Sequence, residues 1–224
     1  MSGELRLLRE QGWCVLKGIV PDDRARELRT TLNGILGNYG CIAPSVNEKA
    51  PLPPITLRAS VIREVPDLAL YVADPRVIGL LESAAGGPVA ATSVTSWAHE
   101  PDDPAGPWHA GEPFDSVSTS GGVHFMLYWM FSAFRPDNGL SVRPMGGGEP
   151  CVITGLPGDV AILDSRLQRS CIANTSALMR FAVVAGYAPV ESGRIPKDEK
   201  AVLARSAFER LPDAAKPLFR HWVE

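Results

Sequence analysis

Apolar residues follow a helical period in the first third of the chain. Within residues 22–36 they recur every three or four positions, as one buried face of a helix requires. These apolar residues are Ala25, Leu28, Leu32 and Leu36. Similar patterns predict helices over residues 4–11 and 74–85. The segment of residues 13–20, between the first two helices, is predicted to be a strand.

From residue 89 onward the pattern changes to short apolar runs separated by turn residues. The predicted strands cover residues 89–99, 122–131, 140–142, 151–153, 160–164 and 181–187. Helices followed by short strands predict a mainly β fold with flanking helices (α+β), in which the strands form a jelly roll, the cupin-like double-stranded β-helix.

The chain is expected to form one domain over residues 1–224, because nothing in its composition suggests a linker. Residues 1–88 are predicted to be a mainly helical flanking part, residues 89–190 the barrel core, and residues 191–224 a helical tail. The Pro-rich residues 40–54 are predicted to be a loop over the mouth of a pocket.

Composition narrows the class of protein further. A net charge of −3 provides no electrostatic attraction to nucleic acid or to a membrane surface. No apolar run approaches a membrane span, and the N-terminus lacks a signal-peptide core. The four cysteines are scattered without a C-x-x-C pair, which favours free thiols in a reducing cytosol. We therefore expect a cytoplasmic protein whose partner is a small molecule.

Candidate chemistry is concentrated in two segments, PWHAGE at 107–112 and GDVAILDSRLQRSCIANTSALMR at 158–180. Together they resemble the phytanoyl-CoA dioxygenase family of Fe(II)/2-oxoglutarate oxygenases. That family carries Trp-His-x-Asp, followed by Gly-Asp-x-x-x-x-Asp-x-Arg-Leu-x-His, Asn-x-Ser and an Arg. The residues in register here are Trp108, His109, Gly158, Asp159, Asp164, Arg166, Leu167, Asn174, Ser176 and Arg180. The similarity extends over nearly the whole chain.

The resemblance implies an iron site that this chain alters. Such oxygenases hold Fe(II) with two histidines and one carboxylate. His109 matches the first histidine, but Gly111 stands at the carboxylate position and Arg169 at the second histidine. A guanidinium stays protonated and cannot ligate a metal. We therefore expect no metal and no cofactor, with Fe(II) and 2-oxoglutarate as the alternative, in which His109 is a ligand.

Two other ligand sets keep a metal in the site. In one, Glu112 supplies the carboxylate and Gln168 an amide oxygen. In the other, His99 joins His109, although an exposed strand-end position is the simpler interpretation of His99. Halogenating relatives carry a small residue in place of the carboxylate but retain both histidines, which argues against halogenation here.

The end of the site that would bind the co-substrate is retained. Arg180 matches the residue that pairs with the distal carboxylate of 2-oxoglutarate in the family, and its planar fork suits any carboxylate. Arg169 is predicted to lie in the same pocket. It either forms an ion pair with Glu112 or Asp164, or binds an anionic substrate and acts as an electrophile. His109 is then the general acid–base, with a pKa expected near neutrality.

His124 and Tyr128 share one face of a predicted strand, and both are candidates to line the pocket, with Tyr128 as a proton donor. The preferred function is a redox-neutral enzyme acting on a small anionic metabolite in natural-product tailoring, by isomerisation, cyclisation, elimination or hydrolysis. The alternatives are an Fe(II)/2-oxoglutarate-dependent hydroxylase or oxidase with unusual ligands, and a non-catalytic small-molecule-binding protein.

Overall fold

The computed structural model describes residues 2–39, 61–110, 124–190 and 203–223. The helices are α1 (Gly3–Gln11), α2 (Asp22–Tyr39), α3 (Val61–Glu64), α4 (Leu68–Val72), α5 (Pro75–Ala85), α6 (Arg205–Glu209), α7 (Lys216–Phe219) and the 3-10 turn η2 (Arg220–Trp222). The strands are β1 (Trp13–Leu16), β2 (Val89–His99), β3 (Phe125–Met130), β4 (Leu140–Val142), β5 (Cys151–Ile153), β6 (Val160–Asp164), β7 (Arg169–Cys171) and β8 (Arg180–Pro189).

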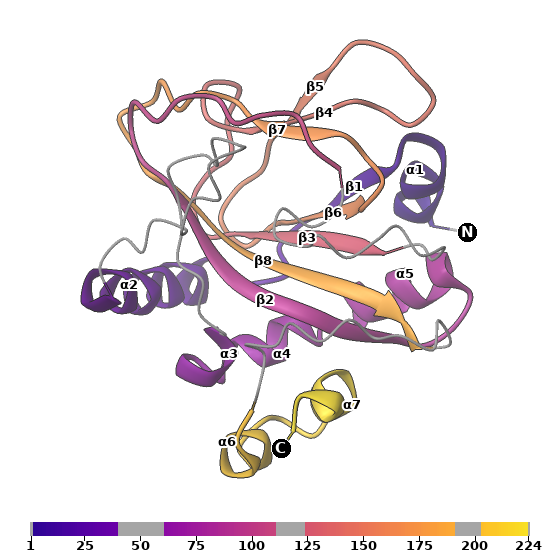
Figure 1. The fold of residues 1–224 in the computed structure, drawn as a ribbon, viewed down its shortest axis with the longest axis vertical. Coiled ribbons are helices and arrows are strands. Elements are labelled where there is room, and N and C mark those ends of the chain that lie inside the picture. Colours follow the sequence, from indigo (N-terminus) through magenta and orange to yellow (C-terminus); the bar gives the residue numbers. More distant parts are fainter. Residues whose placement is uncertain (1, 40–60, 111–123, 191–202, 224) are drawn as a thin grey trace, which may run out of the picture.

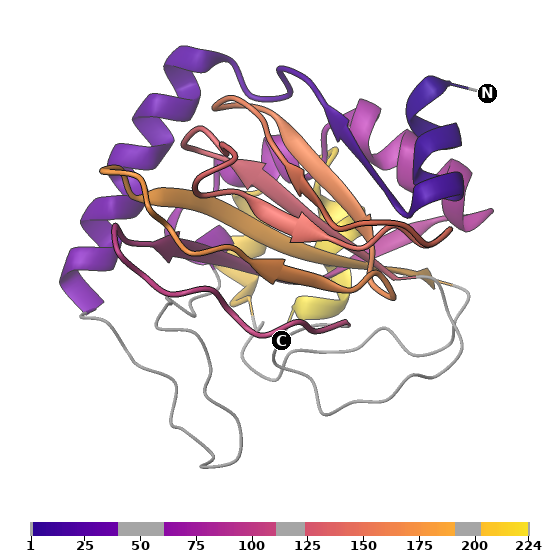
Figure 2. The same ribbon diagram turned by 90° about the horizontal axis from the view of Figure 1, so that it is seen from above.

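The strands form two antiparallel sheets that face each other (Figure 1). The larger sheet has the order β1-β6-β3-β8-β2, and the smaller has the order β5-β4-β7. Seen from above in Figure 2, the smaller sheet lies across the larger one. The fold is therefore the predicted jelly roll with flanking helices.

Alternation along the strands separates two hydrophobic cores. On β8, Phe181, Val183 and Ala185 pack in the core that includes the helices, whereas Ala182 and Val184 pack between the sheets. Figure 1 shows α3, α4, α6 and α7 on the side of the larger sheet that faces away from the smaller one. We call the space between the two sheets the barrel interior.

Most predicted elements are present, with a few corrections. The structure adds strand β7 and the short helices α3 and α4, which the sequence pattern did not indicate. Within the described residues 203–223, the tail that was predicted to be helical forms the short elements α6, α7 and η2. β1 comes from the part predicted to be mainly helical, yet it pairs with β6 at the edge of the larger sheet. The predicted loop at residues 40–54 lies outside the described residues.

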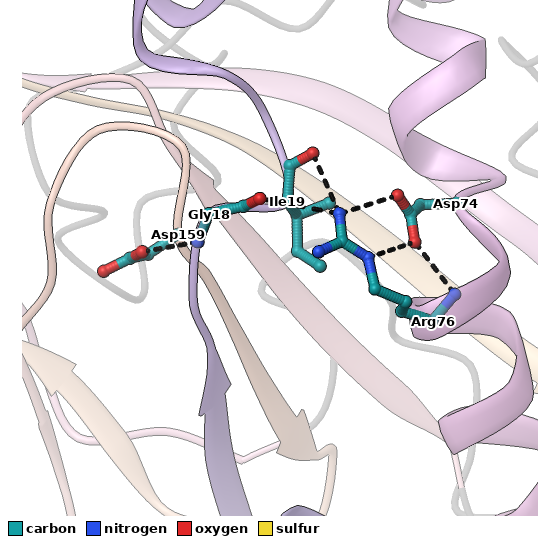
Figure 3. A network of polar contacts seen from close by, with 5 residues as sticks. All are labelled: Gly18, Ile19, Asp74, Arg76 and Asp159. Carbon is teal, nitrogen blue, oxygen red and sulfur yellow. Dashed lines mark hydrogen bonds and ion pairs between the residues drawn. The ribbon is translucent and has the colours of Figure 1, made fainter.

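β1 ends four residues earlier than predicted because the chain turns to bind the β5–β6 turn. Gly18 has a φ of 58°, and its N–H donates to Asp159 at 3.0 Å (Figure 3). The N–H groups of Ile19 and Val20 both donate to the carbonyl of Gly158, at 2.9 and 3.0 Å. These bonds satisfy backbone groups that a longer strand would have paired elsewhere.

The same loop is attached to helix α5. Asp74 caps the helix by accepting from the N–H of Arg76 at 2.8 Å. The guanidinium of Arg76 bonds the Asp74 carboxylate and reaches the carbonyl of Ile19 at 3.3 Å (Figure 3). The Gly-Asp pair of the family motif, Gly158 and Asp159, therefore has a structural role here, since it connects the sheet to the loop before α2.

A Gly158→Ala variant is expected to lose about 3 kcal/mol or more of unfolding free energy. Its φ is 91°, and an added Cβ would lie 2.1 Å from the carbonyl oxygen of Val20, which the paired backbone holds in place. Gly86→Ala is the matched control, because Gly86 has a φ of 81° but open space around it. The control should lose only about 1 kcal/mol. Urea unfolding measures both, and equal losses would refute the steric argument.

None of the helices in the described part of the chain is long and apolar enough to cross a membrane. Of the four cysteines, Cys14, Cys151 and Cys171 are free thiols, and Cys41 lies outside the described residues.

Candidate functional site

Charged and polar side chains from both sheets meet in the barrel interior. Tyr128 on β3 shares the inward face with Met126 and Met130. Arg180 on β8 has the same parity as the inward-facing Ala182 and Val184. On the smaller sheet, β7 places Arg169 and Cys171 opposite the inward-facing Val142 and Leu140 of β4. Tyr128, a candidate to line the pocket if its strand face pointed inward, thus lies in the barrel interior.

Arg169 is completely buried, with an exposed fraction of 0 %. Its Nε donates to the Tyr128 hydroxyl oxygen at 3.1 Å, and its Nη1 donates to the carbonyl of Leu167 at 3.4 Å. Its backbone exchanges two hydrogen bonds with His109, at 2.9 and 3.0 Å. This pairing brings His109 next to Arg169, as the family motif implies for the two positions.

Arg169 is not paired with Asp164, one of the two partners that the sequence suggested. The Asp164 carboxylate lies 2.6 Å from the guanidinium of Arg166, which is two residues away. Strand alternation explains the difference, because Asp164 has the parity of Ile162, which faces the helices, and not that of Leu163 in the interior. Glu112, the other suggested partner, lies outside the described residues, as does Gly111.

His109 differs from its predicted acid–base behaviour. Burial and the positive charge of Arg169 lower its pKa to about 4, where a value near neutrality was predicted. Its Nδ1 is buried and has no hydrogen-bond partner among the described residues. In the free protein at neutral pH, His109 is therefore a neutral imidazole that can accept a proton but has none to donate as an imidazolium.

Arg180 is 1 % exposed and lies among aromatic rings. Its Cζ is 4.8 Å from the ring centroid of Trp97 and 5.2 Å from that of Phe134. Its Nη1 donates to the carbonyls of Asn138, at 2.7 Å, and Gly139. Among the described residues, its Nη2 is buried without a hydrogen-bond partner by geometry and no ion pair includes Arg180, although the guanidinium lies close enough to the Cys171 thiol to oppose the rise in its pKa that burial causes.

His99 is a residue whose environment the sequence did not predict. It was expected to be an exposed strand end, but its exposed fraction is 0 %. It pairs in register with Arg180, so the two side chains lie on the same face of the sheet. Burial and the charge of Arg180 lower its pKa to about 4. The length of β2, which continues to residue 99, was the only sequence signal for this position.

Asn174 holds the ends of β2 and β8 together. Its Nδ2 donates to the carbonyls of His99, Glu100 and Leu178, each at 2.9 Å. Its Oδ1 accepts from the hydroxyl of Ser176 at 2.7 Å. The Asn-x-Ser part of the motif therefore fixes the segment that leads into the strand carrying Arg180.

Gln168 and Trp108 lie apart from this group. Gln168 is exposed, and its Oε1 accepts from Arg143 at 2.8 Å, so it does not enter the interior. Trp108 is 38 % exposed and stacks against the guanidinium of Arg143. His124 is half-buried just before β3, where its carbonyl accepts from Ser165 at 2.8 Å.

These residues do not fit a ferrous ion. No group of three His, Cys, Asp or Glu residues suited to a metal occurs in the described ranges. The side chain beside His109 is the buried guanidinium of Arg169, which repels a divalent cation and offers no lone pair. Arg180, which forms no ion pair with the described residues, favours an anion in the interior.

Lowering the pH is expected to destabilise the protein through His99. Its pKa is about 4 in the folded state and ordinarily 6.5, so the unfolded chain binds more protons between these values. The unfolding free energy should therefore fall as the pH drops from about 7 to about 4, with His99 contributing about 3 kcal/mol. Urea unfolding across this range should show a shallower slope for His99→Gln, and an unchanged slope would contradict the assignment.

Comparison with known proteins agrees with the architecture. No protein-family model and no curated protein sequence matches the chain. Among solved structures, the non-heme α-ketoglutarate-dependent carbocyclase SnoK from nogalamycin biosynthesis matches with a TM-score of 0.69 and 18 % identity, covering 84 % of each chain. The epimerase SnoN, also from nogalamycin biosynthesis, has a TM-score of 0.69 and 14 % identity, covering 83 % of this chain and 79 % of SnoN.

HygX from Streptomyces hygroscopicus, solved with nickel and 2-oxoglutarate bound, is a third similar structure. Its TM-score is 0.64 at 13 % identity, and the match covers 85 % of this chain and 87 % of HygX. The fold is thus that of the non-heme 2-oxoglutarate-dependent oxygenases. At such identities the likeness establishes the fold, and the chemistry has to be argued from the site itself.

Proposed function

We propose that this chain is a phytanoyl-CoA dioxygenase-like enzyme that has lost the iron site and acts on a small anionic metabolite. Its reaction is redox-neutral: an isomerisation, cyclisation, elimination or hydrolysis. The observation that carries the proposal is Arg180, a fully buried cation with an unpartnered Nη2 and no carboxylate partner in the described part of the chain.

A buried charge without a counter-ion is costly, because the desolvation of an ion amounts to several kcal/mol even after relaxation. Two backbone carbonyls and two aromatic rings offset part of that cost for Arg180. A carboxylate or phosphate of a ligand would supply the missing charge. Burial is the main cause of the lowered pKa values of His99 and His109, and the positive charges of Arg180 and Arg169 lower them further.

Arg169, the second interior arginine, lies next to two groups that can take part in proton transfer. Arg169 contacts the Tyr128 hydroxyl and is paired through its backbone with His109. Proton abstraction next to a carboxylate places negative charge on an oxygen, which the guanidinium and the Tyr128 O–H can stabilise. His109 takes the proton from carbon and returns it at a neighbouring position, so that no electrons are gained or lost.

Ligand binding would also change the pKa of His109, the base in this step. An anion beside Arg169 cancels much of the positive field that lowers the pKa of His109. The pKa of His109 then rises in part, which makes the imidazole a stronger base, while burial, the larger cause, continues to lower it. Tyr128 stays protonated throughout, since burial raises its pKa above the usual value.

Natural-product tailoring is the proposed setting. It is supported by analogy with SnoK and SnoN, which belong to nogalamycin biosynthesis. The retained His109 and Arg180 support one alternative, an Fe(II)/2-oxoglutarate-dependent hydroxylase or oxidase in which residues outside the described ranges complete the ligand set. A protein that binds the anion without turnover is the other alternative.

Turnover in the absence of metal and oxygen tests the proposal. Small carboxylic and phosphorylated acids that stabilise the protein thermally are incubated with it anaerobically, with a chelator and without 2-oxoglutarate. We expect an isomer, cyclised, elimination or hydrolysis product by mass spectrometry, formed about 100-fold more slowly by His109→Ala. Activity that a chelator abolishes and Fe(II) restores would establish the oxygenase alternative. Binding of an acid without formation of any product would favour the alternative of a non-catalytic binding protein.

A further inference from the structure

Two unpartnered polar atoms lie at the same end of the barrel interior. One is Nη2 of Arg180, which is a hydrogen-bond donor, and the other is Nδ1 of His99. Their residues are register partners on β8 and β2, and both are at most 1 % exposed. Asn174 donates a hydrogen bond to the backbone carbonyl of His99 and makes none with the imidazole ring. Nδ1 of the imidazole is therefore available to a ligand.

The protonation state of His99 follows from its other nitrogen. Nε2 lies 3.3 Å from the carbonyl oxygen of Pro104, which can only accept, so Nε2 carries the proton. Nδ1 then carries a lone pair and is an acceptor, and it has no partner among the described residues. The lowered pKa of His99 keeps the ring in this neutral form at neutral pH. A donor and an acceptor thus stand side by side without partners.

We propose that Arg180 and His99 together select an organic acid that carries a hydroxyl group next to its carboxylate. The carboxylate pairs with the guanidinium of Arg180, and the hydroxyl donates to Nδ1 of His99. An ammonium group could also donate to His99, but the positive charge of Arg180 disfavours a cation there. This inference rests on the proposed function and specifies its substrate class.

This pair of a donor on Arg180 and an acceptor on His99 also disfavours the binding of keto acids. A 2-oxo acid presents only acceptor oxygens beside its carboxylate, so the lone pair of Nδ1 would face another lone pair. A site that is built to accept a hydrogen bond rejects an analogue that lacks the donor, because its buried polar atom stays unpaired. This end of the barrel interior therefore favours a hydroxy acid over the corresponding keto or unsubstituted acid.

Binding of three matched acids tests the inference by calorimetry, using 2-hydroxyglutarate (both enantiomers), 2-oxoglutarate and glutarate. Wild-type protein should bind one enantiomer of the hydroxy acid about fivefold or more tightly than the other two acids, as one additional hydrogen bond provides. His99→Gln should abolish this preference, since its amide can still donate toward Pro104 but lacks the Nδ1 acceptor. His99→Asn, whose Oδ1 can replace Nδ1, should restore part of the preference.

The outcomes separate this inference from the proposed function. Tight binding of all three acids that depends on Arg180 but shows no preference for the hydroxyl would overturn the role of His99 and leave the anion site standing. A preference that persists in His99→Gln would also overturn it. Failure of wild-type protein to bind any of the acids would count against both. As a direct readout, the ¹⁵N resonance of His99 Nδ1 should shift when 2-hydroxyglutarate binds and stay in place with glutarate.

Discussion

A Gly111→Asp, Arg169→His double variant is expected to retain about one Fe(II) per chain after anaerobic loading and desalting, whereas the wild-type protein retains far less. The variant combines two imidazoles with one carboxylate, the set that non-heme iron enzymes use. Arg169 exchanges two backbone hydrogen bonds with His109, so a histidine at position 169 would stand beside it. We expect a gain in affinity of more than about 100-fold.

The physical reason is that the substitution removes a cation as well as adding ligands. A guanidinium roughly 5 Å from a divalent ion costs about 7 kcal/mol at an effective dielectric constant of 20. Each single variant should therefore fail, since Gly111→Asp leaves the guanidinium in place and Arg169→His lacks the anionic ligand. Elemental analysis measures the iron. Stoichiometric iron in the wild-type protein would disprove the loss of the metal site.

Gly111→Asp combined with Gln168→His provides the matched control. It adds the same two ligand types, but position 168 is exposed and its side chain contacts Arg143. This pair should bind no more iron than the wild-type protein. In the redox-neutral enzyme, the iron-binding double variant should also lose native turnover, because Arg169 no longer holds the substrate anion. Retained turnover would show that Arg169 only fills space.

An Arg180→Met variant is expected to bind small carboxylates about 30-fold more weakly than the wild-type protein. A charge-assisted pair between a guanidinium and a carboxylate contributes about 2 kcal/mol or more, which corresponds to that factor. Met approximates the length of the buried side chain and suits the aromatic rings of Trp97 and Phe134 around it. Thermal shift and calorimetry with 2-oxoglutarate and other mono- and dicarboxylates measure the loss.

Arg135→Met is the control for net charge, because Arg135 is exposed at the turn that precedes β4. It removes one positive charge without touching the interior, so carboxylate binding should change little. Circular dichroism checks that Arg180→Met remains folded despite the loss of donors to the carbonyls of Asn138 and Gly139. Equal effects of the two variants would place the anion site elsewhere.

Sequence reasoning was most successful where one physical pattern decides the structure. The helical spacing of apolar residues predicted α1, α2 and α5, and short apolar runs between turn residues predicted β2, β4, β5 and β6 within a residue or so. Strand β7 was missed because its residues, Arg169–Cys171, are polar in sequence and become buried only through pairing with β4. Their role as the interior wall depends on a partner strand that is distant in the chain.

The site shows the same division. The residue types alone led to two predictions: that the iron site is altered, since an arginine at position 169 cannot be a ligand, and that Arg180 binds a carboxylate. Tertiary structure alone decided which groups share the interior. It turned Asp164 toward Arg166, left Gln168 outside, and brought His99 into register with Arg180. The pKa of about 4 for His109 likewise depends on burial and on a charge from another strand. Local sequence specifies side-chain chemistry and periodicity, whereas desolvation and charge proximity arise only when distant strands pack together.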